Sequence, residues 1–276
     1  MAKAMIFAAG LGTRLKPLTD RMPKALVPVG GKPLLQTVLD RLVTSGYDDI
    51  VVNVHHFAAQ ITDYISALDM PGVRISISDE SGMLRNTGGG IQYAEPLLGN
   101  GNFLVHNVDI ISDLDLRKFA ASVRDEAVAT LAVSSRRTSR YLLFDEEMRL
   151  VGWTNTATGE VRSPFPDLNP DSCRKYAFAG IHLLTHKVFR LFREFGFEGS
   201  FPVMDFYLKA AGKYPVCGYV QEPLEIIDAG KPETLSLARD FLLRHGDILP
   251  QDVQEDYHDK QTCRNQGDVL PCAEKF

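Results

Sequence analysis

Hydrophobic residues in the first half of the chain recur in two alternating patterns. Short runs rich in β-branched residues predict strands at 4–9, 49–54, 73–78, 102–108 and 127–133. Between them lie segments with one apolar helical face, at 32–47, after His56 and at 115–123. Strands that alternate with helices in this way build a parallel sheet. We therefore expect a doubly wound α/β fold that binds its ligands at the carboxyl ends of its strands.

The pattern changes to an antiparallel one from about residue 136. Strands are predicted within 141–153, at 177–184, at 214–221 and at 224–230, and helices at 202–212 and 232–245. We expect one domain over residues 1–244, with a first half ending at about residue 135 and a second half from 136 to 244. Residues 245–276 lose both periodicity and apolar density, which predicts an irregular C-terminal tail or a segment that covers a neighbouring subunit.

Composition narrows the class of ligand. The chain has 276 residues, of which 45% are hydrophobic, and its net charge of -5 gives no general attraction to nucleic acid or to a membrane surface. An anionic ligand must therefore be held by a local group of cations and backbone N–H groups. The four cysteines show no CxxC spacing and the N-terminus has no signal-peptide pattern, so we expect a cytoplasmic protein, with its oligomeric state left open.

A glycine-rich loop follows the first predicted strand. Its sequence is AAGLGTRL, residues 8–15, and it fits neither of the two common phosphate-binding patterns. A dinucleotide fingerprint needs a third glycine where this chain has Leu15, and a Walker A loop needs Gly-Lys-Ser or Gly-Lys-Thr there. Prolines at 17 and 23 also prevent a helix from starting directly after the loop.

The loop and the residues after it form one continuous motif, GLGTRLKPLTDRMPK, residues 10–24. It resembles the signature of the sugar-1-phosphate nucleotidyltransferases, G-x-G-T-R-L-x-P-x-T-x-x-x-P-K, and matches it at every fixed position. The stretches RNTGGGI and NVDIISD are most similar to the uridylyltransferases that act on N-acetylmuramic acid 1-phosphate or related sugar phosphates. The resemblance covers roughly residues 3–244. It implies a Rossmann-like, GT-A-like mixed sheet flanked by helices, with an antiparallel sugar-binding part.

The chemistry of these residue types agrees with that resemblance. Glycines at 10 and 12 let backbone N–H groups approach a triphosphate, and Thr13 lies in the same loop. Arg14 can fork onto phosphate oxygens, and Lys24 adds a compact positive charge. In the family, the sugar phosphate attacks the α-phosphorus of a nucleoside triphosphate and pyrophosphate leaves. The resemblance therefore implies that Arg14 and Lys24 are catalytic through charge and positioning.

A triphosphate in an acidic protein also needs a metal ion, and Mg²⁺ prefers oxygen ligands. The resemblance implies that Asp109 and Asp228 hold Mg²⁺, because each follows a predicted strand as the family's metal aspartates do. The usual Gly-Asp pair is Val108-Asp109 here. Asn107 matches a family contact to the sugar, and Gly180, in the predicted strand 177–184, is a further sugar candidate with a purely structural alternative.

The nucleobase is expected at two glycine-containing segments. A flat base can lie against a backbone without side chains, and TGGGI, residues 87–91, has three glycines at a predicted helix start. In the family, this segment and the first loop read the base. We therefore expect base contacts from Ala8, Ala9 and Gly88, with Thr87 as a further nucleotide-binding residue.

The sugar contacts of the second half cannot be assigned by spacing. Asp205 and Lys175 are candidates, and the turn from Arg136 to Arg140 either is a solvated basic turn or meets a carboxylate or phosphate of the sugar. Two alternative functions also stay open. One is a guanylyltransferase that makes a GDP-sugar, because the signature does not distinguish bases. The other is a non-catalytic relative that senses nucleotide sugars, although Lys24 and both aspartates are present.

Overall fold

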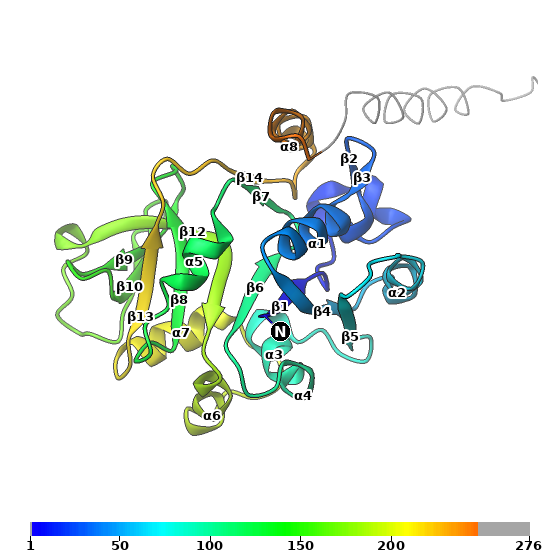
Figure 1. The fold of residues 1–276 in the computed structure, drawn as a ribbon. Coiled ribbons are helices and arrows are strands. Elements are labelled where there is room, and N and C mark those ends of the chain that lie inside the picture. The colour runs from blue at the N-terminus through cyan, green and yellow to red at the C-terminus, as the bar shows by residue number, and fades with distance from the viewer. Residues whose placement is uncertain (1, 248–276) are drawn as a thin grey trace, which may run out of the picture.

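The computed structural model describes residues 2–247 and is built around one mixed sheet of ten strands (Figure 1). The strand order is β11-β10-β9-β12-β6-β1-β4-β5, with β8 pairing β12 and β13 pairing β8. These strands are β1 (Ala2–Phe7), β4 (Tyr47–Val54), β5 (Arg74–Asp79), β6 (Phe103–Asn107), β8 (Ala129–Ser134), β9 (Arg140–Phe144), β10 (Leu150–Asn155), β11 (Glu160–Arg162), β12 (Arg174–Leu184) and β13 (Val216–Val220). Two small sheets add β2 (Pro28–Val29) with β3 (Lys32–Pro33), and β7 (Ile110–Ser112) with β14 (Ile226–Asp228).

The parallel part of the sheet brings three strand ends to one edge. β1 lies between β4 and β6 and runs parallel to both, and β5 runs parallel to β4. The register pairs Phe7 with Asn53 on one side and with Asn107 on the other. Side chains at the carboxyl ends of these strands therefore lie next to one another, as expected for a ligand site in such a sheet.

Helices cover both faces of the sheet, which confirms the doubly wound α/β class expected from the sequence. On one face of the sheet, alternate strand residues such as Ile6 and Val52 pack against α1, α2, α5 and α8. On the other face, Met5 and Val51 pack against α3, α4, α6 and α7. The helices are α1 (Leu34–Thr44), α2 (Ala58–Ser66), α3 (Asn86–Tyr93), α4 (Glu95–Leu98), α5 (Leu116–Ala121), α6 (Lys187–Glu194), α7 (Val203–Ala211) and α8 (Pro232–His245).

The second half of the chain completes the same sheet. β12 comes from that half, yet it runs antiparallel to β6 of the first half and also pairs with β8 and β9. The two halves expected from the sequence therefore share one continuous sheet. The predicted tail begins within α8, which ends at His245, and its residues from 248 on lie outside the described part of the chain. Within residues 2–247, no helix has the length and apolarity that a membrane crossing requires.

The three glycines of TGGGI lie inside α3 rather than before it, and packing explains each of them. An ideal Cβ at Gly88 would stand 2.3 Å from Cε2 of Phe201, and one at Gly89 would stand 2.1 Å from the carbonyl oxygen of Gly199. A Cβ at Gly90 would stand 2.8 Å from Oε1 of Glu80. The backbone N–H groups of Gly88 and Gly89 both donate to the carbonyl oxygen of Phe201, at 2.8 and 3.2 Å. The segment before α7 is thus pressed directly onto the backbone of α3.

We predict that Gly89→Ala destabilises the protein, against the helix preference of alanine. Alanine gains roughly 1 kcal/mol over glycine in a helix interior, but the new methyl group would overlap a backbone carbonyl that cannot swing away. Overpacking of this kind costs about 1–3 kcal/mol. We expect a net loss in the free energy of unfolding, measured by urea denaturation. Gly82→Ala is the matched control, because a Cβ there meets nothing within 4 Å. Equal stability of both variants would show that α3 and Gly199 are not in rigid contact.

Candidate active site

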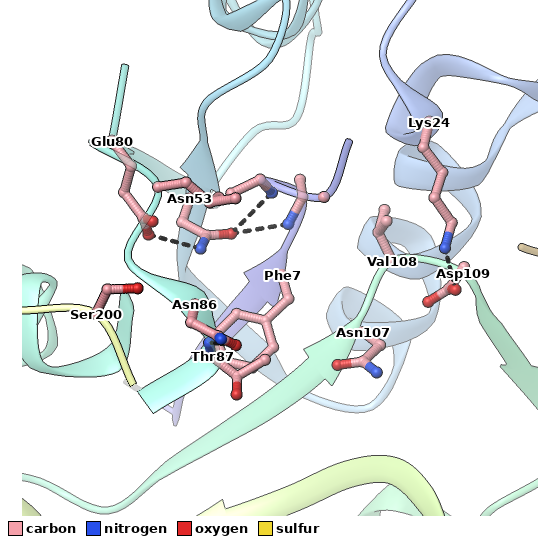
Figure 2. Close-up of a pocket in the computed structure, with 14 residues that line it drawn as sticks. Phe7, Lys24, Asn53, Glu80, Asn86, Thr87, Asn107, Val108, Asp109 and Ser200 are labelled. Atoms are coloured by element: carbon pink, nitrogen blue, oxygen red, sulfur yellow. Dashed lines mark hydrogen bonds and ion pairs between the residues drawn. The ribbon is translucent and has the colours of Figure 1, made fainter. Parts of the chain in front are cut away.

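A cavity of about 390 Å³ opens at the carboxyl ends of β1, β4 and β6, and Figure 2 shows the side chains that face it. Its walls come from six segments: the end of β1 with the first loop, the segment of Lys24, the end of β4, the segment from Glu80 into the start of α3, the end of β6 with the residues after it, and the segment before α7. The lining residues are Phe7, Ala8, Ala9, Gly10, Lys24, Asn53, Glu80, Leu84, Asn86, Thr87, Asn107, Val108, Asp109 and Ser200. The site thus lies where the alternation of strands and helices predicted it.

Three of the loop residues expected at the nucleotide line this cavity. Ala8 and Ala9 follow β1, and their N–H groups both donate to Oδ1 of Asn53, at 2.8 and 3.3 Å. Gly10 comes next and has open space where a side chain would lie. Asn53 did not stand out in the sequence analysis, although an amide at the end of the apolar run DIVVNV was a signal for a buried polar contact.

The rest of the loop folds back on itself and positions Lys24. Gly12 has a φ of 64°, in the left-handed region that favours glycine, and its carbonyl accepts the Thr19 hydroxyl at 2.8 Å. A Cβ at Gly12 would stand 3.0 Å from Cβ of Lys24, so the loop and the lysine are in close contact. Thr13 begins a short 3-10 helix, Thr13–Leu15, and is not among the residues that line the cavity.

Two cations and two carboxylates meet beside the cavity, which Lys24 and Asp109 line and Arg14 and Asp228 do not. Nζ of Lys24 contacts Oδ2 of Asp109, and both side chains are largely buried. Arg14 lies over the pair, with NH1 at 3.3 Å from Oδ2 of Asp228 and NH2 at 3.9 Å from Oδ2 of Asp109. The four residues expected to carry charge in the reaction, Arg14, Lys24, Asp109 and Asp228, are therefore brought together from four separate segments.

Strand pairing brings Asp228 to Asp109. β14 runs antiparallel to β7 and pairs Asp228 with Ile110, and the N–H of Ala229 donates to the backbone carbonyl of Asp109 at 2.8 Å. Burial alone would raise the pKa of Asp228. The N–H of Gly230 and the charges of Arg14 and Lys24 outweigh burial and hold that pKa below its usual value. The carboxylate form, which binds cations, is thereby favoured.

Gly230 packs directly against the two aspartates and Lys24. An ideal Cβ at Gly230 would stand 2.7 Å from Oδ2 of Asp109, 2.8 Å from Oδ1 of Asp228 and 2.7 Å from Nζ of Lys24. Any side chain at 230 would collide with both carboxylates and with the Lys24 ammonium, so glycine there lets the two aspartates come close together. Within residues 2–247, no three His, Cys, Asp or Glu side chains form a metal-binding group. A divalent ion here would take two carboxylates and complete its shell with phosphate oxygens and water.

The predicted sugar residues lie on the neighbouring strands. Asn107 ends β6 and points into the cavity (Figure 2). Gly180 lies in β12 with a φ of 76°, and a Cβ there would stand 2.9 Å from Nδ2 of Asn107. Asp205 instead pairs with Arg162 at 2.7 Å, and Lys175 pairs with Asp171 at 2.9 Å. Neither Asp205 nor Lys175 lines the cavity.

The opposite wall contains Thr87 together with two residues that sequence reasoning missed. Thr87 faces the cavity, and its hydroxyl oxygen accepts the N–H of Val203 at 2.9 Å. Gly88 is buried behind it, under Phe201, and does not line the cavity. Asn86 and Ser200 do line it (Figure 2), and Asn86 has a φ of 60°, a conformation that asparagine tolerates better than most residues. A positive φ in α3 has no sequence signature beyond the asparagine itself.

The comparisons with known proteins agree with this geometry. The family model described as nucleotidyl transferase matches residues 3–144. The chain is 36% identical over 229 residues to N-acetylmuramate alpha-1-phosphate uridylyltransferase of Caulobacter vibrioides, covering 80% of this chain and 89% of the relative. It is 46% identical over 113 residues to the enzyme of the same name from Neisseria meningitidis, covering 41% of this chain and 49% of the relative.

Solved structures share the fold at lower sequence identity. HddC from Yersinia pseudotuberculosis, complexed with GMP-PN, matches with a TM-score of 0.69 and 23% identity, over 88% of this chain and all of HddC. A putative glucose-1-phosphate thymidylyltransferase from Bacillus anthracis matches with a TM-score of 0.71 and 20% identity, over 87% of this chain and 95% of that protein. The mixed sheet with its flanking helices is therefore a fold found among nucleotidyltransferases.

Proposed function

Since this chain belongs to the nucleotidyl transferase family, and within it to the sugar-1-phosphate nucleotidyltransferases, we propose that it joins UTP to N-acetylmuramic acid 1-phosphate and releases pyrophosphate. The observation that carries the proposal is the meeting of Arg14, Lys24, Asp109 and Asp228 beside a cavity lined by the first loop. The two relatives that carry this activity in their names support the choice of base and sugar.

The chain's own residues position the reaction and stabilise charge. A phosphate oxygen of the sugar phosphate forms a bond to the α-phosphorus of UTP, and the bond from that phosphorus to the bridging oxygen of pyrophosphate breaks. Lys24 and Arg14 lie where negative charge grows on the phosphate oxygens, so no protein nucleophile is required. The backbone of Gly10 and Gly12 can approach the phosphates, and Thr13 follows them at the start of a short 3-10 helix.

Magnesium completes the charge balance in this proposal, held by Asp109 and Asp228. When bound, Mg²⁺ neutralises phosphate charge and polarises the oxygens of the reacting phosphate. The lysine and arginine heads beside the two aspartates offset the negative charge of the carboxylates while no triphosphate is present. Lys24 can then move from Asp109 to a phosphate oxygen, since both acceptors attract an ammonium group.

Asn107 and Gly180 are the proposed sugar contacts. Asn107 lines the cavity with an amide that can hydrogen-bond hydroxyl groups, and the lack of a side chain at Gly180 lets that amide pack directly against β12. N-Acetylmuramic acid differs from other N-acetylhexosamines by a lactyl carboxylate. The turn from Arg136 to Arg140 carries three arginines, and Nη2 of Arg136 donates to the carbonyl oxygen of Phe178, in β12, at 3.1 Å. We place the carboxylate towards this turn.

The purified enzyme should prefer UTP to GTP by about tenfold or more in kcat/KM, which needs only ~1.4 kcal/mol of differential transition-state binding. One or two hydrogen bonds to the base in the cavity of 390 Å³ supply that amount. The measurement is product formation from each of the four nucleoside triphosphates with a panel of sugar 1-phosphates. Faster synthesis of GDP-mannose from GTP and mannose 1-phosphate than of any UDP-sugar would identify a guanylyltransferase instead. Nucleotide-sugar binding without turnover would identify a sensor.

A further inference from the structure

The buried side chains of Asn53 and Glu80 connect the two walls of the cavity. Asn53 is the second-last residue of β4 and is 3% exposed, and Glu80 follows β5 and is 2% exposed. Nδ2 of Asn53 donates to Oε1 of Glu80 at 2.8 Å. Figure 2 shows the chain of hydrogen bonds that runs from the first loop through Asn53 to Glu80.

Each residue of this pair also accepts hydrogen bonds from backbone N–H groups. Oδ1 of Asn53 accepts the N–H groups of Ala8 and Ala9, which open the first loop. Oε2 of Glu80 accepts the N–H of Arg85, at 3.2 Å, just before α3 begins. Four hydrogen bonds thereby tie the loop on one wall to the start of α3 on the other, where Asn86 and Thr87 line the cavity.

The chemistry at position 80 allows only one kind of side chain. Both of its partners, the amide of Asn53 and the N–H of Arg85, are donors, so both side-chain oxygens must accept. A carboxylate satisfies that condition, whereas glutamine would turn its NH₂ group towards one of the two donors. Burial raises the pKa of Glu80 above its usual value, although the bonds from Asn53 and Arg85 oppose that effect. A buried carboxylate costs free energy of folding unless it is hydrogen-bonded. The bonds from Asn53 and Arg85 meet that requirement at Glu80.

We propose that Asn53 and Glu80 are positioning residues that fix the width of the slot that receives the nucleotide. This inference rests on the proposed function, because it takes the cavity as the nucleotide site. The side chains of Asn53 and Glu80 hydrogen-bond mainly to backbone N–H groups and to each other. The two residues therefore influence the nucleotide through the positions of the loop and of α3. The pair determines how far Ala8 and Ala9 lie from Thr87, and therefore how well a base fits between them.

An exchange of donor and acceptor tests the proposal. Asn53→Asp keeps an acceptor for Ala8 and Ala9 but sets a second carboxylate against Glu80, and Glu80→Gln loses one of its two bonds. In the double variant, the NH₂ group of residue 80 donates to the carboxylate of residue 53, and its carbonyl accepts the N–H of Arg85. All four bonds can then form again, with the charge moved from residue 80 to residue 53.

We expect Asn53→Asp to raise the Kd for UTP, measured by calorimetry, by at least ~10-fold, since one buried pair of like charges replaces a hydrogen bond. Glu80→Gln should raise it by ~3-fold to 10-fold, and the double variant should return to within about threefold of wild type. The KM for UTP should follow the Kd, while kcat at saturating UTP changes less. Tyr207→Phe is the matched control. It removes another buried bond, at 2.6 Å to His182, and should lower the Tm without changing the Kd for UTP.

The outcomes separate this inference from the function it rests on. A wild-type protein that neither binds nor converts any nucleoside triphosphate would overturn the proposed function and the inference together. Wild-type activity with an unchanged Kd in both single variants would overturn the inference alone. A double variant that binds UTP as poorly as Asn53→Asp would also overturn it. If Asn53→Asp does not fold, Glu80→Gln decides, because it changes one atom of a side chain of the same size.

Discussion

Lys24→Ala should lower kcat by at least ~100-fold, the scale seen when one preorganised charge-stabilising group is removed from an active site. Lys24 contacts Asp109, and it packs against Gly230 at its ammonium and against Gly12 at its Cβ. Among residues 2–247, no other lysine lines the cavity, and Arg14 is too exposed and too far from Asp109, at 3.9 Å, to take its place. The measurement is the steady-state rate with UTP and sugar 1-phosphate both saturating.

The matched control for this prediction is Lys16→Ala. Lys16 belongs to the same segment, but its ammonium pairs with Asp20 on the surface, at 3.1 Å, and the pair is largely exposed. Exposed pairs contribute ~0–1 kcal/mol, so this variant should keep the wild-type rate. Circular dichroism and thermal denaturation should show that Lys24→Ala is folded. Half of the wild-type rate in a folded Lys24→Ala protein would mean that the reacting phosphorus lies elsewhere.

Removal of divalent metal should abolish activity, and Mg²⁺ should restore it. Asp109→Asn and Asp228→Asn should each raise the Mg²⁺ concentration required for half-maximal rate by at least ~10-fold, and at limiting Mg²⁺ lower the rate by ~100-fold, because an amide is a much weaker ligand for a hard cation than a carboxylate. Asp109→Asn should have the larger effect. Its side chain is the more buried of the two, at 11% exposed against 37%, so water replaces it less readily.

Asp40→Asn serves as the control for the metal prediction. Asp40 is a comparably exposed carboxylate that pairs with Lys32 at 3.0 Å, and it does not line the cavity. Its variant should show the Mg²⁺ titration of the wild type. Full activity in excess chelator would remove both Asp109 and Asp228 from a metal-binding role, while the assignments of Lys24 and the first loop would not depend on that result.

Local patterns were sufficient to predict the fold. The strands β1, β4, β5, β6 and β8 were expected within a few residues of where they lie, because buried strands of this kind are continuous apolar runs, whereas the short strands β2, β3 and β7 were missed. The start of α8 at Pro232 was also expected, since proline fits the first turn of a helix. The helix α6 was missed, although its apolar residues Val188, Phe189, Leu191 and Phe192 follow helical spacing.

The site was only partly predictable, because its residues depend on contacts far apart in the chain. The close approach of Asp228 to Asp109 requires the pairing of β14 with β7, which no local pattern specifies. The bonds of Asn53 to Ala8 and Ala9 span more than forty residues, so that asparagine looked like the end of an ordinary strand. The glycines of α3 were interpreted as space for a flat base. In the structure, Gly88 and Gly89 make room for Phe201 and for the Gly199 carbonyl, a packing role that the sequence does not reveal.

The position of β12 between β6 and the strands β8 and β9 has a consequence for how this enzyme can be divided or recombined. The family model ends at residue 144, within the hairpin of β9 and β10, but a chain cut there would lack β12 and leave one edge of β6 without its partner. An unpaired apolar edge of this kind promotes pairing with other molecules. A chimera that exchanged the second half between relatives at this boundary would separate strands of one sheet. A functional chimera must therefore keep β12, which pairs with β6, and α7, whose preceding segment packs on α3, together with the first half of the same chain.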